Sequence, residues 1–221
     1  LGHVVFEVVF AGDLLNQCTS SAFGLRELGI PFLGQFGACS TMAQTLFLAA
    51  TTVEAGIADY SVAVTSSHFC SSERQFRFPL NYGGQRTPTA QWTVTGSGAI
   101  VLEKQENPGV KVKQATVGKI VDLGIKDANN MGAAMAPAAA KTMQSFFEDT
   151  KTHPSEYDMI FTGDLGEVGS NLFKELMLKD GFRIGDNYND CGLMIYQKEV
   201  QDVHAGGSGC GCSASVLCSL I

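Results

Sequence analysis

Cys39 and Ser40 are the residues of this chain whose types and placement most suggest chemistry. They follow a turn punctuated by Gly34 and Gly37, and from Met42 onward apolar residues recur at 42, 46, 49, 50, 53 and 57, which is helical spacing. A thiol at the start of a helix lies near unpaired N–H groups and the positive end of the helix dipole, which favour the thiolate. Cys39 is therefore a candidate nucleophile or part of an anion-binding site. The alternative is a small core residue at a tight turn.

The helix that begins at this pair carries very few charges. Glu54 is the only charged residue before Gly56 closes the segment. A helix of this kind is usually buried on most of its circumference. We therefore expect residues 40–54 to form a helix buried between layers of the fold, with Cys39 facing a cavity.

Histidines supply the other candidate reactive groups. Residues 60–65 (YSVAVT) predict a buried strand, and two serines and His68 follow it directly. In open α/β sheets ligands bind at the carboxyl ends of strands, so His68 is a candidate; the alternative is a structural histidine with satisfied hydrogen bonds. His3 lies next to the first residue and His153 in a polar turn, where we expect it to be exposed. His204 opens a glycine-rich turn.

The composition of the chain limits which classes of protein it can belong to. The chain has 221 residues, of which 45% are apolar and 17% charged, so it can bury a sizeable core. Its net charge of −7 argues against a nucleic-acid-binding surface. Its seven cysteines form no pair with metal-binding spacing, and several lie in apolar surroundings, as reduced thiols inside cells commonly do. No signal peptide and no apolar run of about 18 residues is visible.

Both ends of the sequence lack the polar tail that a complete domain usually has. The first residue stands at the threshold of a predicted strand, and Ile221 lies within an apolar, helical pattern. We expect the chain to be part of a longer protein.

Periodicity and turn residues predict alternating strands and helices. We expect strands at residues 4–11, 60–65, 110–120, 158–162 and 192–197, and a strand pair or bulged strand at 92–103. Helices are expected at residues 14–28, 40–54, 138–150 and 171–179, and from 212 onward. Residues 73–91 and 129–137 are expected to be irregular.

Two pairs of similar segments indicate an internal duplication. FAGDLLNQ at residues 10–17 matches FTGDLGEV at 161–168, and GACSTMAQTL at 37–46 is echoed by GCGCSASVLC at 209–218. The order of the two units is kept and their offsets are similar, which chance matches seldom show. With a polar break near residues 103–108, we expect two related α/β halves, residues 1–105 and 106–221.

Longer segments resemble the thiolase-like superfamily, whose members duplicate an α/β/α half around a helix headed by a nucleophilic cysteine. GACSTMAQTLFLAATTVEAGIADYSVAV is similar to the nucleophile segment of ketoacyl synthases and thiolases, TGSGAIVLE to their GDGAGAVVLE turn, and HAGGSGCGCSA to the CxGGG loop of thiolases. Within the superfamily, FAGDLLNQ, QFGACST, YGGQRTPTAQWTVTGSGA, NMGAAMAPAA, FTGDLG, DCGLMIY and GGSGCGCSA resemble a family of stage V sporulation proteins of spore-forming bacteria. The resemblance implies a thiolase-like duplicated α/β/α layered fold, here truncated at both ends.

The same resemblance implies a role in binding. Proteins of this family bind dipicolinic acid and belong to the machinery that moves it, with calcium, into the developing spore. The implied partners are dipicolinic acid, other stage V sporulation A proteins at the spore inner membrane, and a second copy of the chain in a homodimer. Neither nucleic acid nor a cofactor or metal is expected, and the implied location is the developing spore, peripheral to its inner membrane through those partners.

For a flat pyridine dicarboxylate, backbone N–H groups at the helix start after Cys39 and in the glycine-rich turn are suitable partners. Arg74, Arg77 or Arg86 would add a bidentate clamp, the alternative for each being an ordinary loop arginine. Asp13 and Asp164 hold equivalent positions in the repeat, where capping of the following helix is the alternative. The candidate ligand-binding residues are Cys39, Ser40, His68, Arg86, Asp164, His204, Gly207 and Ser208.

An acyl-thioester condensing or transfer enzyme of the ketoacyl synthase or thiolase type is the second hypothesis, with Cys39, His68 and His204 as its catalytic residues. His204 stands where thiolases carry their second cysteine. The thiolase GHP histidine is missing, because Leu193 and Met194 follow DCG, and GDLG at residues 163–166 stands at the HQAN position of the type III ketoacyl synthases. Two standard catalytic positions are thus vacated, and fold alone does not carry function.

Overall fold

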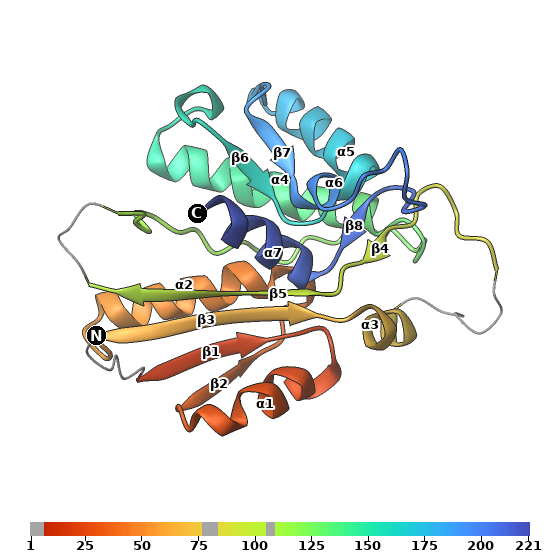
Figure 1. The fold of residues 1–221 in the computed structure, drawn as a ribbon. Helices are drawn as coiled ribbons and strands as arrows, with labels where there is room; N and C mark the ends of the chain where they lie inside the picture. The colour runs from red at the N-terminus through yellow and green to blue at the C-terminus, as the bar shows by residue number, and fades with distance from the viewer. Residues whose placement is uncertain (1–6, 77–83, 105–108) are drawn as a thin grey trace. The chain divides into compact units, whose positions relative to one another are not determined.

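The computed structural model describes residues 7–76, 84–104 and 109–221, which form two compact units (Figure 1). The first unit comprises Leu1–Phe76, Thr93–Lys113 and Gly209–Ile221, and the second comprises Arg77–Trp92 and Gln114–Ser208. His3, Arg77 and the first residues of the predicted strand 4–11 lie outside the described residues. The two halves 1–105 and 106–221 concern duplication along the sequence, and they stay a prediction.

A four-stranded sheet forms the centre of the first unit, in the order β2-β1-β3-β5. β1 (Val8–Gly12) pairs in parallel with both β2 (Phe32–Gln35) and β3 (Tyr60–Ser67). β5 (Gly96–Glu103) pairs antiparallel with β3. The carboxyl ends of three parallel strands therefore lie at one edge of this sheet.

Helices cover both faces of this sheet, because successive side chains of a strand point to opposite faces. Phe10 belongs to an apolar cluster with residues of α2 (Thr41–Glu54) on one face. Val9 belongs to a second cluster, packed against the last residue of α1 (Thr19–Leu25) on the other face. The first unit is therefore layered, as predicted for an α/β fold.

α7 (Cys210–Leu220) packs against β5 on the face that also carries α2. The contact depends on glycine. A Cβ atom on Gly98 would lie 2.7 Å from both the Ala214 carbonyl oxygen and the Cys218 Sγ, and one on Gly96 would lie 2.4 Å from the Ser215 Oγ. The glycines of the TGSGA segment thus allow a helix backbone to approach the strand closely.

The α2 helix forms where residues 40–54 were predicted to be helical, but its burial differs from the expectation. The buried residues lie along one stripe: Thr41, Met42, Thr45, Ala49 and Val53. Ala43, Thr51 and Glu54 are exposed on the other side. The expectation that the helix is buried on most of its circumference is wrong for the described residues, because the sheet and α7 cover a single stripe of it.

The second unit is built around two packed helices and a short parallel strand pair. α4 (Met131–Thr150) packs against α5 (Gly166–Lys179), and β6 (Ile160–Thr162) pairs with β7 (Tyr188–Asp190). Its core consists mainly of aromatic and long apolar side chains, with alanines on α4: Ala136, Ala140, Phe147, Ile160, Leu165, Phe173, Met177 and Tyr188.

The remaining elements are short. They are α3 (Phe69–Phe76), β4 (Trp92–Thr93), α6 (Cys191–Met194), β8 (Gly207–Ser208) and 3-10 turns at Asn16–Cys18, Arg26–Leu28, Ala38–Ser40 and Pro154–Glu156. The predicted helix 14–28 is therefore correct only in α1, which 3-10 turns flank on both sides. The segment 73–91 begins inside α3 and is not irregular throughout.

Several predicted elements are confirmed. The strands expected at 60–65, 92–103 and 158–162 correspond to β3, to β4 with β5, and to β6. The helices expected at 138–150, at 171–179 and from 212 onward lie within α4, α5 and α7. The helices among these segments have long apolar patterns, and the strands have short apolar runs.

Three predicted elements are wrong. Residues 192–197 begin in α6, because the Asp190 side chain accepts a hydrogen bond from the Gly192 N–H and caps a helix there. Residues 131–137 are helical despite Pro137, because Asn130 caps α4 through the Ala133 N–H (3.2 Å). Described residues 110–120 form neither strand nor helix and are mostly exposed, so their partial alternation has no sheet to face.

Candidate functional site

Cys39 lies where the sequence predicts it, in the 3-10 turn Ala38–Ser40 that leads into α2. The turn is closed by local hydrogen bonds: the Ser40 hydroxyl donates to the Gly37 carbonyl (2.7 Å), and the Thr41 hydroxyl donates to the Ala38 carbonyl (2.8 Å). A Cβ on Gly37 would lie 2.4 Å from the Gln44 Oε1 and 2.7 Å from the Ser40 Oγ, so both side chains would have to move to accept one. The Cys39 side chain is half-buried and the Ser40 side chain is exposed.

The first turn of α2 has no side-chain cap. Ser40 occupies the N-cap position, yet its hydroxyl turns back to Gly37 and accepts nothing from the helix. The N–H groups of a first helical turn have no partner within the helix. The Ser40 N–H donates to the Gly37 carbonyl (3.0 Å) and the Thr41 N–H donates to the Ala38 carbonyl, so the turn uses these two backbone donors itself and no N-cap side chain caps the helix.

His68 directly follows β3, as predicted, and its side chain is exposed. It lines a cavity of about 570 Å³ at the carboxyl ends of β1 and β3. Hydroxyl groups dominate the lining: Ser20, Ser66, Ser67, Ser71, Thr95 and Ser97, with Asp13 in the wall. The Asp13 carboxylate accepts hydrogen bonds from the Leu15 N–H, the Ser21 N–H and the Ser21 hydroxyl at 2.6 to 2.7 Å.

In the second unit, Asp164, Gly207 and Ser208 belong to one hydrogen-bond network. The Ser208 hydroxyl donates to the Asp164 carboxylate (3.3 Å). The Gln91 Nε2 donates both to the Asp164 carbonyl (2.7 Å) and to the Gly207 carbonyl (2.8 Å). Asp164, Ser208 and Gln91 are all buried.

Arg86 also contacts Gln91, through the backbone carbonyl of Gln91 rather than its side chain. Its Nη1 donates to the Gln91 carbonyl (2.9 Å), and its guanidinium lies over the Trp92 ring, 4.2 Å from the ring centroid. A guanidinium can lie over an aromatic ring and donate a directed hydrogen bond at the same time, which suits arginine better than lysine. Whether Arg86 also contacts a ligand stays a prediction.

Asp190, which was not among the candidate residues, is the hub beside this network. Its carboxylate accepts hydrogen bonds from the Thr162 hydroxyl (2.6 Å) and from the N–H groups of Leu165, Gly166 and Gly192 (2.9 to 3.0 Å). It therefore holds the starts of both α5 and α6. Burial raises the pKa of Asp190 to about 6, against the lowering effect of these hydrogen bonds.

His204 is half-buried and has a left-handed backbone conformation (φ 48°). Its Nε2 lies 3.4 Å from the Asp202 Oδ1. The turn that follows is tight, because a Cβ atom on Gly206 (φ 111°) would lie 2.6 Å from the Gly192 carbonyl oxygen. His204 is thus the accessible end of a buried glycine-rich turn.

Other candidates have simpler surroundings. Arg74 is exposed on α3. Cys210 and Cys212 are fully buried on α7, and burial raises the pKa of Cys191 to about 12, as the nearby Asp190 also does. These thiols are packing residues rather than nucleophiles.

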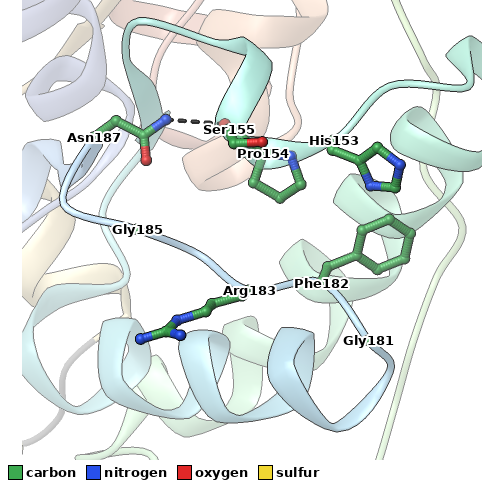
Figure 2. Close-up of a pocket in the computed structure, with 8 residues that line it drawn as sticks. All are labelled: His153, Pro154, Ser155, Gly181, Phe182, Arg183, Gly185 and Asn187. Carbon is green, nitrogen blue, oxygen red and sulfur yellow. Dashed lines mark hydrogen bonds between the residues drawn. The ribbon is translucent and has the colours of Figure 1, made fainter.

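The second unit also has an open cavity of about 460 Å³ at its surface (Figure 2). His153, exposed as predicted, and Phe182 face each other across it, while the Arg183 side chain points away from them. The Asn187 amide donates to the Pro154 carbonyl (2.9 Å) in its wall. No buried charged group lines this cavity, which distinguishes it from the Gln91 network.

The candidate residues thus fall into two sets. Cys39, Ser40 and His68 belong to the first unit, at the carboxyl edge of its sheet, and Arg86, Asp164, His204, Gly207 and Ser208 belong to the second. Sequence reasoning missed Gln91 and Asp190. The signal for Asp190 was present, since an aspartate followed by a cysteine and a glycine is a plausible helix cap, but Gln91 gave no comparable signal.

Comparisons with known proteins identify the family. A family model described as Stage V sporulation protein AD matches residues 3–221. The Stage V sporulation protein AD of Bacillus subtilis (strain 168) is 50% identical over 216 residues, which cover 97% of this chain and 63% of that protein. The chain therefore spans less than two thirds of the length of this relative.

Solved structures with the same fold include condensing enzymes. AbyA1, a tetronic acid condensing enzyme, has a TM-score of 0.63 at 16% identity and covers 97% of this chain and 69% of its own. The 3-oxoacyl-[acyl-carrier-protein] synthase III of Aquifex aeolicus has a TM-score of 0.58 at 11% identity, covering 96% and 67%. Xanthomonas campestris OleA with bound lauric acid and lauroyl-CoA has a TM-score of 0.66 at 12% identity, covering 97% and 67%. The fold is thiolase-like, as predicted, and the chain belongs to the Stage V sporulation protein AD family.

Proposed function

We propose that this chain binds dipicolinic acid without chemical turnover, as a component of the machinery that brings dipicolinate, with calcium, into the developing spore. Membership of a sporulation family supports the setting. Dipicolinate is a flat pyridine with two carboxylates, so its site must offer donors for two anionic groups.

The observation that carries the proposal is the uncapped first turn of α2. The Ser40 hydroxyl donates to Gly37, so the N-cap side chain does not cap α2. The Ser40 and Thr41 N–H groups donate to carbonyls of the preceding turn, so a ligand carboxylate would bind the N–H groups that follow Thr41. A helix N-terminus with unpaired N–H groups favours a carboxylate. The half-buried Cys39 thiol would form one wall beside it, and His68 would contribute from the end of β3.

In the second unit, the turn that His204 opens, with Gly207 and Ser208 in its backbone, is a second and separate candidate for contact with the ligand. The side chain of Asp164 is turned to the Ser208 hydroxyl (3.3 Å), so its role is to hold the turn rather than to approach a dianion. Arg86 acts on the segment before Trp92 through the Gln91 carbonyl. The residues near Cys39 in the first unit and the turn residues in the second unit need separate binding tests.

Titration of the full-length protein with dipicolinate by calorimetry tests the proposal. Cys39→Ala should weaken binding about 5- to 30-fold, the effect of one lost polar or packing contact of about 1–2 kcal/mol. Cys39→Asp should weaken it far more, because a carboxylate then faces the ligand carboxylates. Cys70→Ala, the same change at an exposed cysteine, is the control and should leave affinity unchanged. An unmodified protein that does not bind dipicolinate would refute the proposal.

An acyl-thioester condensing or transfer reaction at Cys39 is the second candidate function. The specific observation that favours it is a half-buried cysteine at a helix start in a fold shared with condensing enzymes. We expect no acyl adduct on Cys39 by intact-mass analysis after incubation with acetyl-CoA or longer acyl-CoAs. A stoichiometric adduct that Cys39→Ala abolishes would favour this candidate over the binding function.

The same proposal implies that the chain has protein partners. Within residues 7–76, 84–104 and 109–221, no helix combines the length and apolar character needed to cross a membrane. We propose that other stage V sporulation A proteins supply the attachment to the spore inner membrane, and that two copies of the chain pair. β3 is hydrogen-bonded on both edges and most of its side chains are buried, so pairing near residues 60–65 would depend on the loops that flank them. Sedimentation of the intact protein as a monomer only would refute the dimer.

A further inference from the structure

The glycine-rich turn of the second unit is held by a segment more than a hundred residues earlier in the chain. The Ala205 N–H donates to the Ala90 carbonyl (2.9 Å), and the Trp92 N–H donates to the Gly206 carbonyl (2.8 Å). Between these two bonds, the Gln91 side chain donates to the Gly207 carbonyl (2.8 Å). Residues 90, 91 and 92 therefore form hydrogen bonds with residues 205, 207 and 206 of the turn, respectively.

The Gln91 amide also ties this turn to a second one. Its Nε2 donates to the Asp164 carbonyl (2.7 Å), so both of its hydrogens are used and the orientation of the amide is fixed. The space around it is closed, because a Cβ on Gly166 (φ 64°) would lie 2.8 Å from the Nε2. A longer or shorter side chain at position 91 could not bridge the same two carbonyls.

Two observations indicate that the Gln91 amide serves to position the turn rather than to raise the free energy of unfolding. Gln91 is 3% exposed, and no described residue donates to its Oε1. A buried acceptor without a donor is unfavourable, which offsets part of what the two Nε2 bonds contribute. The backbone of Gln91 is itself held by Arg86, whose guanidinium stacks on Trp92.

From this geometry we infer that Gln91 is the positioning residue of the turn from His204 to Ser208, and that it sets dipicolinate affinity without touching the ligand. The inference rests on the proposed function, in which this turn contacts the ligand. Arg86 supports Gln91, so its contribution to binding is transmitted through the backbone of residue 91.

The test compares Gln91→Leu with Gln144→Leu in the intact protein. Gln144 is also a buried glutamine of the second unit, but it lies on α4 and donates to Asp180, outside the two turns. At a temperature where both variants are folded by circular dichroism, Gln91→Leu should weaken dipicolinate binding about tenfold, and Gln144→Leu should leave it within about twofold. Affinity that changes equally in both variants, or in neither, would overturn the inference.

Amide hydrogen exchange provides a readout that needs no ligand. Exchange of residues 205–207 should become faster in Gln91→Leu and stay unchanged in Gln144→Leu, because only the first loses the bridge. Unchanged exchange in Gln91→Leu would overturn the positioning role even if dipicolinate binds. If the unmodified protein fails to bind dipicolinate but the exchange of Gln91→Leu rises, the proposed function fails while the positioning of the turn by Gln91 is supported.

Discussion

The two Gly-Asp-Leu turns of this protein share a sequence and differ in what their aspartates do. Asp13, after β1, receives hydrogen bonds from the Leu15 N–H, the Ser21 N–H and the Ser21 hydroxyl. Asp164, after β6, receives one from the Ser208 hydroxyl. The start of the helix after the second turn is held by Asp190, on β7.

The comparison shows that a repeated sequence can keep the same backbone turn while the aspartate in it has different hydrogen-bond partners. In the first turn the helix α1 begins with serine donors within reach of Asp13. In the second, α5 begins at Gly166 in a left-handed conformation, and its N–H points to Asp190. Asp164 accepts a hydrogen bond from Ser208 in the glycine-rich turn, while Asp190 accepts those of the helix start.

Removal of the Asp190 carboxylate should have the largest effect on this arrangement. Asp190→Ala leaves three buried backbone N–H groups and the Thr162 hydroxyl without their acceptor, so we expect a loss of about 4 kcal/mol in the free energy of unfolding. Urea denaturation of the intact protein measures it. A loss below about 1 kcal/mol would mean that Asp164, or water, takes over the helix start.

Asp13→Ala should have a smaller effect, because it removes the acceptor for two backbone donors and one hydroxyl. We expect a loss of about 2 kcal/mol by the same denaturation. Ser21→Ala is the matched control: it removes only the hydroxyl bond and should cost about 1 kcal/mol. Equal losses for Asp13→Ala and Asp190→Ala would break the comparison between the two turns.

The smallest effect concerns the part of the Asp190 pKa shift that is due to Asp164. Burial raises the pKa of Asp190 from 3.8 to about 6, and the Asp164 carboxylate adds to the rise. Because the native state then binds more protons than the unfolded chain between these values, the part of the stability that is linked to the Asp190 proton is fully present below pH 3.8 and is lost as the pH rises through about 6. The hydrogen bonds that Asp190→Ala removes are a separate contribution.

Asp164→Asn removes a negative charge near Asp190, so it should lower the pKa of Asp190 and narrow the pH range over which the linked stability is lost. A carboxyl NMR titration of the intact protein measures the pKa, and unfolding as a function of pH measures the window. Asp13→Asn, in the first unit, is the control and should leave the titration of Asp190 unchanged. An Asp190 pKa that stays the same in Asp164→Asn would show that the two carboxylates do not interact.

The α/β class and the long helices could be predicted from the sequence, because apolar periodicity over many residues reflects a packed face. The short strands β2 and β7 could not, because a glycine and a glutamine interrupt the apolar residues of β2, and two of the three residues of β7 are Asn189 and Asp190. β6 is equally short, but it belongs to the apolar run MIF that predicted it. Residues 192–197 read as a strand because Leu, Ile and Tyr favour strands locally. The Asp190 cap overrides that preference.

The start of α2 at Cys39 could also be predicted, since the glycine turn and the helical pattern are both local. The partners of the other candidates could not. Arg86 meets Gln91 five residues later, but Gln91 meets Asp164 and Gly207 across 73 and 116 residues of chain. Contacts of that separation depend on the tertiary fold, which a single sequence does not encode in any local pattern.

The docking of α7 on the glycines of β5 has a consequence for the order in which the protein folds during synthesis. α7 belongs to the first unit, although the residues of the second unit precede it in the chain. A ribosome therefore releases nearly all of the second unit before the last helix of the first is available. Until then Gly96 and Gly98 present a bare strand surface, and chaperone or nascent-chain contacts would concentrate there.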